Sequence, residues 1–153
     1  MNKLWVFDID NTLANVHHRW EHLRGDKKDW DTFFSLQHLD EPYQAVVDVL
    51  HALALDGHKI IVVTGRDERF REETLEWLNK HIEFEFDNED LYMRPSDNRE
   101  DDDILKVRII KDWLSKNPEY KVQGIFDDRH RIIDAFRAEG WYTFECNQER
   151  LEY

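Results

Sequence analysis

Three short apolar runs lie far apart in this 153-residue chain, and each is followed at once by polar residues. The runs are Leu4–Phe7, Ile60–Val63 and Ile125–Phe126. Unbroken apolar runs of this length are typical of strands that are buried on both faces of a parallel sheet. Because neighbouring parallel strands end at the same edge of a sheet, we expect the polar residues that follow them to gather at that edge.

The segments between these runs show helical spacing of apolar residues, which predicts strands that alternate with helices. Strands are expected at Leu4–Phe7, Lys59–Val63, Leu91–Met93, Val122–Phe126 and Trp141–Glu145, and helices at about 42–55, 68–81, 103–116 and 129–139. Alternation of this kind, joined by right-handed crossovers, indicates an α/β fold with a doubly wound parallel sheet. Ligands in such sheets bind beyond the carboxyl ends of the strands.

Residues 15–40 do not follow this alternation. The segment comes directly after the first polar motif and is too short to form a domain of its own. We therefore expect one domain over residues 1–153 that carries a small helical cap insert at 15–40. Most tryptophans are expected in the core, but Trp20, Trp30 and Phe34 fall near the expected mouth of the site.

The formal net charge of −13 is opposite to that of a typical nucleic-acid binder, so no stable binding of duplex DNA is expected. The acidic residues are concentrated in residues 83–103, which hold ten acidic and two basic residues. The rest of the chain has a net charge of about −5. A single cysteine excludes an internal disulfide and favours a reducing, cytoplasmic location. No apolar run is long enough to cross a bilayer, and the oligomeric state stays open.

Two pairs of carboxylates follow the first and the third apolar run. Asp8 and Asp10 would face the same side of an extended chain, and such close carboxylates repel unless a cation or a shared proton intervenes. Asp127 and Asp128 are adjacent at a strand end, where burial without a cation would be costly. Oxygen ligands of this kind suit Mg²⁺, so all four are candidate metal residues. The alternative for the first pair is a solvated acidic turn.

The second run is followed by Thr64 and Gly65, which offer a hydroxyl and backbone N–H groups at the expected start of a helix. Such a helix start can bind a phosphate, although Thr64 could also serve only as an N-cap. Lys106, on an expected helix, would by itself be a solvated surface residue. If the fold gathers these groups with the carboxylates, transfer of a phosphoryl group to an aspartate is the leading chemistry.

The order Asp8-x-Asp10-x-Thr12, Thr64, Lys106, Asp127-Asp128 strongly resembles the haloacid dehalogenase (HAD) superfamily of phosphohydrolases. The resemblance spans nearly the whole chain and implies a HAD-like, Rossmann-type fold.

That resemblance also implies a covalent route with Mg²⁺ as cofactor. Asp8 would attack phosphorus, and Asp10 would protonate the leaving oxygen and then activate water. Neighbouring carboxylates are expected to raise the pKa of Asp10 for this work. Asp8, the backbone carbonyl of Asp10 and Asp127 would hold the metal, with Asp128 nearby or bound through water. The residues implied to bind the phosphoryl oxygens are Thr64 and Lys106.

A closer resemblance is to the 3′-phosphatase domain of phage-type polynucleotide kinase/phosphatases. The matching segments are Phe7 to Ala14, Arg19, Thr64-Gly65-Arg66, Asp102 to Lys106 (one spacer shorter than in the family) and Asp127-Asp128-Arg129. The resemblance implies hydrolysis of 3′-phosphates on nucleic-acid ends or nucleotides. The residues placed on the substrate side are Thr12, Arg19, Gly65 and Arg66. Asn11 stands where glycine is common, and no G-x-x-x-x-G-K-[ST] kinase loop is present.

Three other functions remain as alternatives at this stage. A nucleoside 5′-monophosphatase would use the same aspartyl-phosphate chemistry on a different substrate. A receiver-like signalling module also uses acidic residues, a threonine and a lysine, but its phosphorylated aspartate ends a middle strand rather than the first one along the chain. An acidic DNA mimic is suggested by the net charge alone and would not need Thr64 or Lys106.

Overall fold

Five parallel strands form the centre of the protein, whose computed structural model describes residues 1–152. The sheet order is β5-β4-β1-β6-β7. The strands are β1 (Asn2–Phe7), β4 (Lys59–Asp67), β5 (Leu91–Arg94), β6 (Tyr120–Asp127) and β7 (Thr143–Glu145). The chain leaves β1 toward β4 on one side and returns to β6 on the other, which is the doubly wound arrangement predicted from the sequence.

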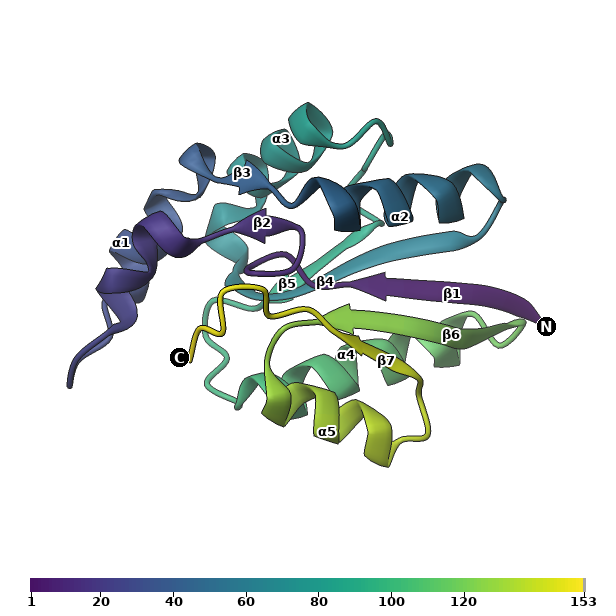
Figure 1. Cartoon of the computed structure of the whole chain (residues 1–153). Helices are drawn as coiled ribbons and strands as arrows, with labels where there is room; N and C mark the ends of the chain where they lie inside the picture. Colours follow the sequence, from purple (N-terminus) through teal and green to yellow (C-terminus); the bar gives the residue numbers. More distant parts are fainter. Residues whose placement is uncertain (153) are drawn as a thin grey trace.

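Four helices cover the two faces of this sheet. Helices α2 (Gln44–Leu55) and α3 (Arg71–His81) lie on one face, and α4 (Asp102–Lys116) and α5 (His130–Ala138) lie on the other (Figure 1). These bounds differ from the expected ones mainly at α3, which begins three residues later because a short 3₁₀ turn, Glu68–Phe70, precedes it. The predicted α/β fold class with helices on both faces is confirmed.

The apolar runs alternate between two cores, because successive strand side chains point to opposite faces. Ile60 and Val62 pack with the α2 and α3 layer, whereas Ile61 and Val63 pack with the α4 and α5 layer. All four are at most 1% exposed. Burial of each such side chain contributes about 1.5–3 kcal/mol, which explains why the runs contain no polar residue.

A tight contact fixes the register of β1 against β6. The pairing of these strands shifts between Leu4 and Trp5, opposite Gly124. A Cβ atom at Gly124 would lie 2.4 Å from the indole ring of Trp5, so the position has no room for a side chain. The register holds the ends of β1 and β6, which carry Asp8 and Asp127, side by side.

The segment that was expected to form a cap insert, called the cap below, lies at the carboxyl end of the sheet, at the left of Figure 1. It consists of η1 (His17–Leu23), α1 (Trp30–Ser35) and η2 (Gln37–Leu39). Two short antiparallel strands, β2 (Ala14–Asn15) and β3 (Glu41–Pro42), close its neck, and neither was expected from the sequence. Leu151 from the C-terminal tail is buried in the cap's own core with Val16, Leu23, Phe33 and Phe34.

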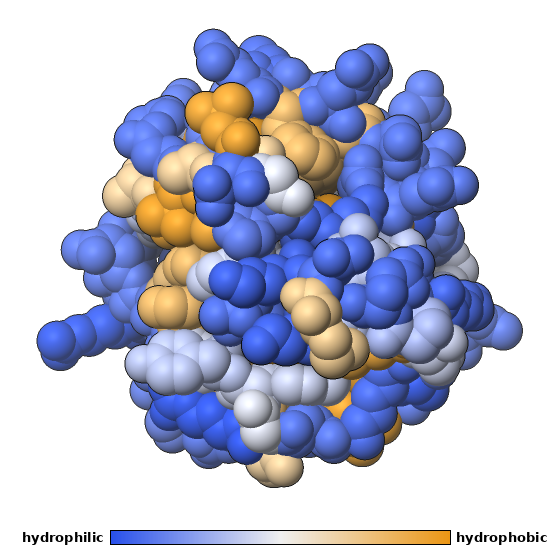
Figure 2. Space-filling view, turned by 90° about the vertical axis from the view of Figure 1, so that its right-hand side faces the viewer, coloured by the Kyte–Doolittle hydropathy of each residue, from blue (hydrophilic) through white to orange (hydrophobic). Residues whose placement is uncertain are grey.

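The opposite end of the molecule, where β1 begins, has a mainly hydrophilic surface with separate apolar patches (Figure 2). Among residues 1–152, no helix combines the length and the apolar character needed to cross a lipid bilayer.

Candidate active site

A tight turn after β1 sends the two carboxylates of the first motif in different directions. The backbone N–H groups of Thr12, Leu13 and Ala14 all donate to the carbonyl oxygen of Ile9, at 3.1, 3.0 and 2.9 Å. This curl places Asp8 toward the end of β6 and Asp10 toward the cap. Both residues are nearly buried, at 5% and 8% exposure, so the alternative of a solvated acidic turn does not describe this structure.

Asp8 lies in a buried cluster with Asp127 and Asp128, whose carboxylate oxygens come within 4.8 Å of one another. The Nζ atom of Lys106 donates to Asp8 Oδ1 at 2.8 Å and to Asp127 Oδ2 at 2.7 Å. The other oxygen of Asp127 accepts from the backbone N–H groups of Asp128 and Arg129, which fixes the carboxylate. Lys106 is 3% exposed, so it is not the surface lysine that the residue alone would suggest.

The charges of this cluster shift its pKa values strongly. Burial, and then the negative charge of Asp127, raise the pKa of Asp8 to about 7. Burial, Asp8 and Asp127 also raise the pKa of Asp128 well above its usual range. Burial alone would lower the pKa of Lys106, but Asp127 and Asp8 outweigh it and raise the value. The ammonium is shared between two carboxylates, so it does not cancel their mutual repulsion.

This donor set fits a magnesium ion. Mg²⁺ prefers oxygen ligands and is usually held by one or two carboxylates together with waters. Asp8, Asp127 and Asp128 offer three such oxygens in a region where uncompensated negative charge is costly. The side chain of Asp10 is not part of this group, so any contribution of Asp10 to a metal would come from its backbone.

Asp10 is instead held between two arginines. Arg19 Nη2 donates to Asp10 Oδ1 at 2.6 Å, and Arg66 donates to the same oxygen through Nη2 at 2.7 Å and to Oδ2 through Nε at 3.1 Å. Burial alone would raise the pKa of Asp10, but Arg66 and Arg19 outweigh it and hold the value well below the ordinary range. The expectation that neighbouring carboxylates raise this pKa is therefore wrong, because the side chain turns away from them.

The two arginines belong to a buried network that the sequence did not reveal. Arg19 also donates to Asp40 at 2.8 and 2.7 Å, and Arg66 donates to the side chain of Gln37. Both arginines are at most 1% exposed. Asp40 was visible in the sequence only as an acidic residue ahead of a helix. Only the folded structure shows that Asp40 is a partner of Arg19.

Thr64 does not cap a helix, because β4 continues through it to Asp67. Its Oγ1 atom accepts a hydrogen bond from the backbone N–H of Arg66 at 3.2 Å. The expected helix start at this point is wrong, since α3 begins at Arg71. The extended backbone brings Gly65 against Asp102, whose Oδ1 would lie 2.6 Å from a Cβ atom at Gly65. Asp102 in turn pairs with Arg94 and with Arg129, a role that only the structure reveals.

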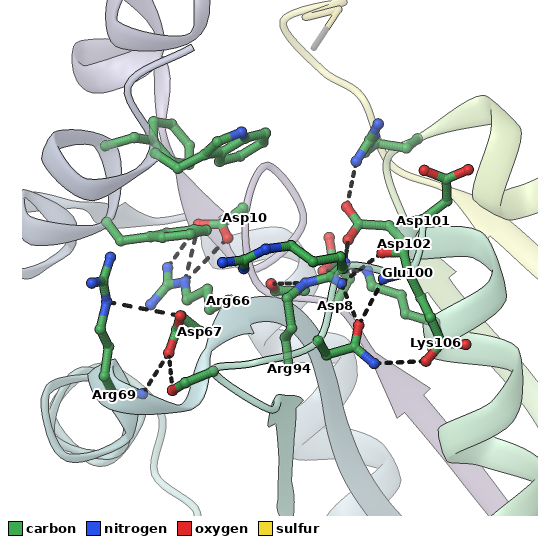
Figure 3. Close-up of a pocket in the computed structure, with 18 of the residues that line it drawn as sticks. Asp8, Asp10, Arg66, Asp67, Arg69, Arg94, Glu100, Asp101, Asp102 and Lys106 are labelled. Carbon is green, nitrogen blue, oxygen red and sulfur yellow. Dashed lines mark hydrogen bonds and ion pairs between the residues drawn. The ribbon is translucent and has the colours of Figure 1, made fainter.

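A cavity of about 650 Å³ joins these groups (Figure 3). Six of the ten residues singled out from the sequence line it, namely Asp8, Asp10, Gly65, Arg66, Lys106 and Asp128. The other four lie buried behind its wall, namely Thr12, Arg19, Thr64 and Asp127. Thr12 donates to Asp8 Oδ2 at 3.2 Å and so orients the carboxylate. The structure thus divides the predicted set into groups that face the cavity and groups that support them.

Asn11 connects this cluster to the C-terminal tail. Its φ angle of 61° lies in the left-handed region, which glycine adopts without strain. Its Nδ2 atom donates to Asp128 Oδ2 at 3.2 Å and to Asn147 Oδ1 at 2.7 Å. Asn147 also accepts from the backbone N–H of Leu151, the tail residue that is buried in the cap. A side chain at position 11 therefore orients a candidate metal carboxylate.

We expect Asn11→Gly to weaken Mg²⁺ binding by roughly 10–100-fold, the usual effect of losing a partner that orients a metal ligand. The backbone tolerates the change, so the fold should persist. The measurement is the rise in melting temperature during a Mg²⁺ titration. Tyr43→Phe is the matched control, because it removes only the 3.4 Å hydrogen bond from the Tyr43 hydroxyl to the side-chain oxygen Oδ1 of Asn11. An unchanged Mg²⁺ midpoint in Asn11→Gly would contradict the assignment.

Comparisons with known proteins agree with this geometry. Residues 2–150 match the model of the family described as the polynucleotide kinase PNKP phosphatase domain. A protein assigned as a bifunctional polynucleotide kinase/RNA ligase in Autographa californica nuclear polyhedrosis virus is 30% identical over 95 residues, which are 61% of this chain and 13% of the viral protein.

Solved structures of related proteins share the fold of this chain. A chain in the Pnkp1/Rnl/Hen1 complex is 25% identical with a TM-score of 0.77, and the match covers 99% of this chain and 47% of that one. The class C acid phosphatase from Bacillus anthracis shares the fold, with a TM-score of 0.69 at 12% identity over 95% of this chain and 66% of that one. This chain thus spans less than half of the Pnkp1-complex chain and a small part of the viral relative.

Proposed function

Because this chain belongs to the PNKP phosphatase domain family of the HAD superfamily, we propose that it is a Mg²⁺-dependent phosphomonoesterase that removes 3′-phosphates from nucleic-acid ends. The observation that carries the proposal is the meeting of Asp8, Lys106 and Asp128 with Asp10 at one cavity. A phosphate bound in this cavity would meet the carboxylate of Asp8 as nucleophile, the ammonium of Lys106 as cation and the carboxylate of Asp10 as acid and base. The family also favours turnover over the receiver-like alternative, in which a phosphorylated aspartate persists.

In the first step, the Asp8 carboxylate attacks phosphorus, and the bond to the ester oxygen breaks. The product is an aspartyl-phosphate on Asp8, and the ester oxygen leaves with a proton from Asp10. Lys106, 2.8 Å from Asp8, stabilises the charge that develops on the phosphoryl oxygens. Mg²⁺, when held by Asp8, Asp127 and Asp128, supplies further stabilisation of this charge.

In the second step, water attacks the aspartyl-phosphate and releases inorganic phosphate. Asp10 accepts the proton of that water, and its ionised form is the one that Arg19 and Arg66 maintain in this structure. Donation of a proton in the first step requires these arginines to loosen their hold, which an incoming phosphate dianion promotes by competing for Arg66 at the cavity wall. The arginine pair therefore acts on Asp10 rather than on a distant part of the substrate.

The proposal is tested with matched single-stranded oligonucleotides that carry a 3′-phosphate or a 5′-phosphate, together with a nucleoside 5′-monophosphate. We expect a preference for the 3′-phosphate of at least about tenfold in kcat/KM, and loss of activity when EDTA replaces Mg²⁺. Single strands should be better substrates than blunt duplexes, because the net charge of −13 repels the denser charge of a duplex. A preference for the 5′-monophosphate would identify a nucleotidase with the same chemistry.

A further inference from the structure

The cavity is larger than a phosphate requires. Its volume of about 650 Å³ lies within the range of sites that enclose whole small ligands. Its lining extends from Asp8 and Lys106 to Trp30 and Phe34 of the cap and to Arg99 of the loop before α4. The space beyond the phosphate position can therefore hold the nucleoside that carries the phosphate.

The cap wall of this cavity is an aromatic surface that is braced from behind. The ring of Trp30 stacks on Phe34 with centroids 5.6 Å apart and meets the edge of Phe33 at 5.8 Å. Phe33 in turn packs under the guanidinium of Arg19 at 4.0 Å. Phe33 and Phe34 are buried, whereas Trp30 is only partly buried, and the exposed side chain of Lys28 lies 5.7 Å from its ring. A braced, partly exposed indole of this kind offers a stacking platform for a nucleobase that displaces the exposed Lys28 side chain from its ring.

The lining of the cavity also includes an arginine that forms no ion pair within the described part of the chain, although its charge acts on the carboxylate of Asp67. Of the arginines that line the cavity, Arg66 binds Asp10, Arg69 binds Asp31, Arg131 binds Asp101 and Asp103, and Arg94 and Arg129 both bind Asp102. Arg99 is exposed and forms no hydrogen bond or ion pair within residues 1–152. A phosphate that reaches Arg99 can bind it without first breaking an ion pair.

We propose that this cavity holds the 3′-terminal nucleotide of a single strand, with its base stacked on Trp30 and the phosphodiester on its 5′ side bound by Arg99. The inference rests on the proposed function and deepens it, because it names the residues that hold the terminal base and the flanking phosphodiester of such an end. Arg19 and Arg66, which the sequence resemblance placed on the substrate side, are buried against Asp10 and are not part of this subsite.

The experiment compares three substrates: a 3′-phosphorylated dinucleotide, the same molecule with an abasic tetrahydrofuran residue at its 3′ end, and a nucleoside 3′-phosphate. Trp30→Ala should raise KM for the dinucleotide by roughly 5–150-fold, the range of stacking on one base, and change KM for the abasic substrate by less than about twofold. Trp30→Phe should restore most of the loss. Arg99→Gln should raise KM for the dinucleotide by about tenfold and leave the nucleoside 3′-phosphate unaffected.

Two matched variants control for general effects of the substitutions. Trp20→Ala removes a second cap tryptophan that does not line the cavity, and Arg131→Gln removes an arginine that lines it but is already paired. Both should leave all three KM values near those of the wild type. Equal losses of Trp30→Ala on the abasic and the complete dinucleotide, or equal effects of Arg99→Gln and Arg131→Gln, would overturn the nucleotide subsite while the 3′-phosphatase proposal stands. A wild-type protein that hydrolyses only nucleoside 5′-monophosphates would overturn both.

Discussion

Asp8→Asn is expected to lower kcat by at least about 10⁴-fold, because an amide cannot attack phosphorus and the rest of the site cannot replace the missing nucleophile. The side chain keeps its shape, so the fold should be retained. Release of phosphate from a 3′-phosphorylated oligonucleotide measures the loss. Asp112→Asn on the far part of α4 is the matched control, since that side chain is 63% exposed and lies outside the cavity.

The same substitution should stabilise the metal-free protein at neutral and alkaline pH. Burial and Asp127 raise the pKa of Asp8 to about 7, above its value of about 4 in the unfolded chain. The folded state therefore binds this proton more tightly, and the wild type loses stability as the pH rises from about 4 to about 7. Melting curves in EDTA should show Asp8→Asn above the wild type at pH 8, with the difference closing toward pH 4. Near wild-type turnover in Asp8→Asn would remove Asp8 from the nucleophile's role.

Arg19→Met is expected to lower the free energy of unfolding by about 3–5 kcal/mol, which is the usual cost of leaving a buried charge without its partner. Arg19 is fully buried and donates four hydrogen bonds, to Asp10, to Asp40 twice and to the carbonyl of Phe33. For a chain of this size the loss corresponds to a fall in melting temperature of roughly 6–20 °C. Arg131→Gln, which removes two ion pairs at the surface, should leave the melting temperature close to that of the wild type.

The pH dependence identifies the cause of this loss. Arg66 and Arg19 hold the pKa of Asp10 below its unfolded value, so the stability that this carboxylate contributes is present above about pH 4 and is lost as the pH falls further. The difference in stability between the wild type and Arg19→Met should therefore narrow below about pH 4. Chemical denaturation at pH 7 and at pH 3 measures it. A difference that stays constant with pH would show that lost packing on Phe33, rather than lost charge, causes the effect.

Asp10 shows why part of the site could not be predicted from the sequence. Its partners Arg19 and Arg66 lie 9 and 56 positions away, and Asp40, which binds Arg19, lies 30 positions away. Nothing in this spacing indicates that the fold brings them together. A pKa depends on the nearest charges in space, and for Asp10 these are the two arginines rather than Asp8, two positions away in the sequence. The pairing of Asp102 with Arg94 and Arg129 and the contact of Asn11 with Asn147 were hidden for the same reason.

The sequence by itself determined the parallel sheet and the edge at which the chemistry lies. Continuous apolar runs that end in Asp8, Thr64 and Asp127 can satisfy their burial only as inner strands, and parallel strands carry their following residues to one edge. The tertiary structure decided which way each side chain points after the strand ends. A turn on Ile9 separates Asp8 from Asp10, and the cap then surrounds Asp10 with arginines. Periodicity reports local burial, whereas the charge environment of a buried carboxylate is set by contacts between distant segments.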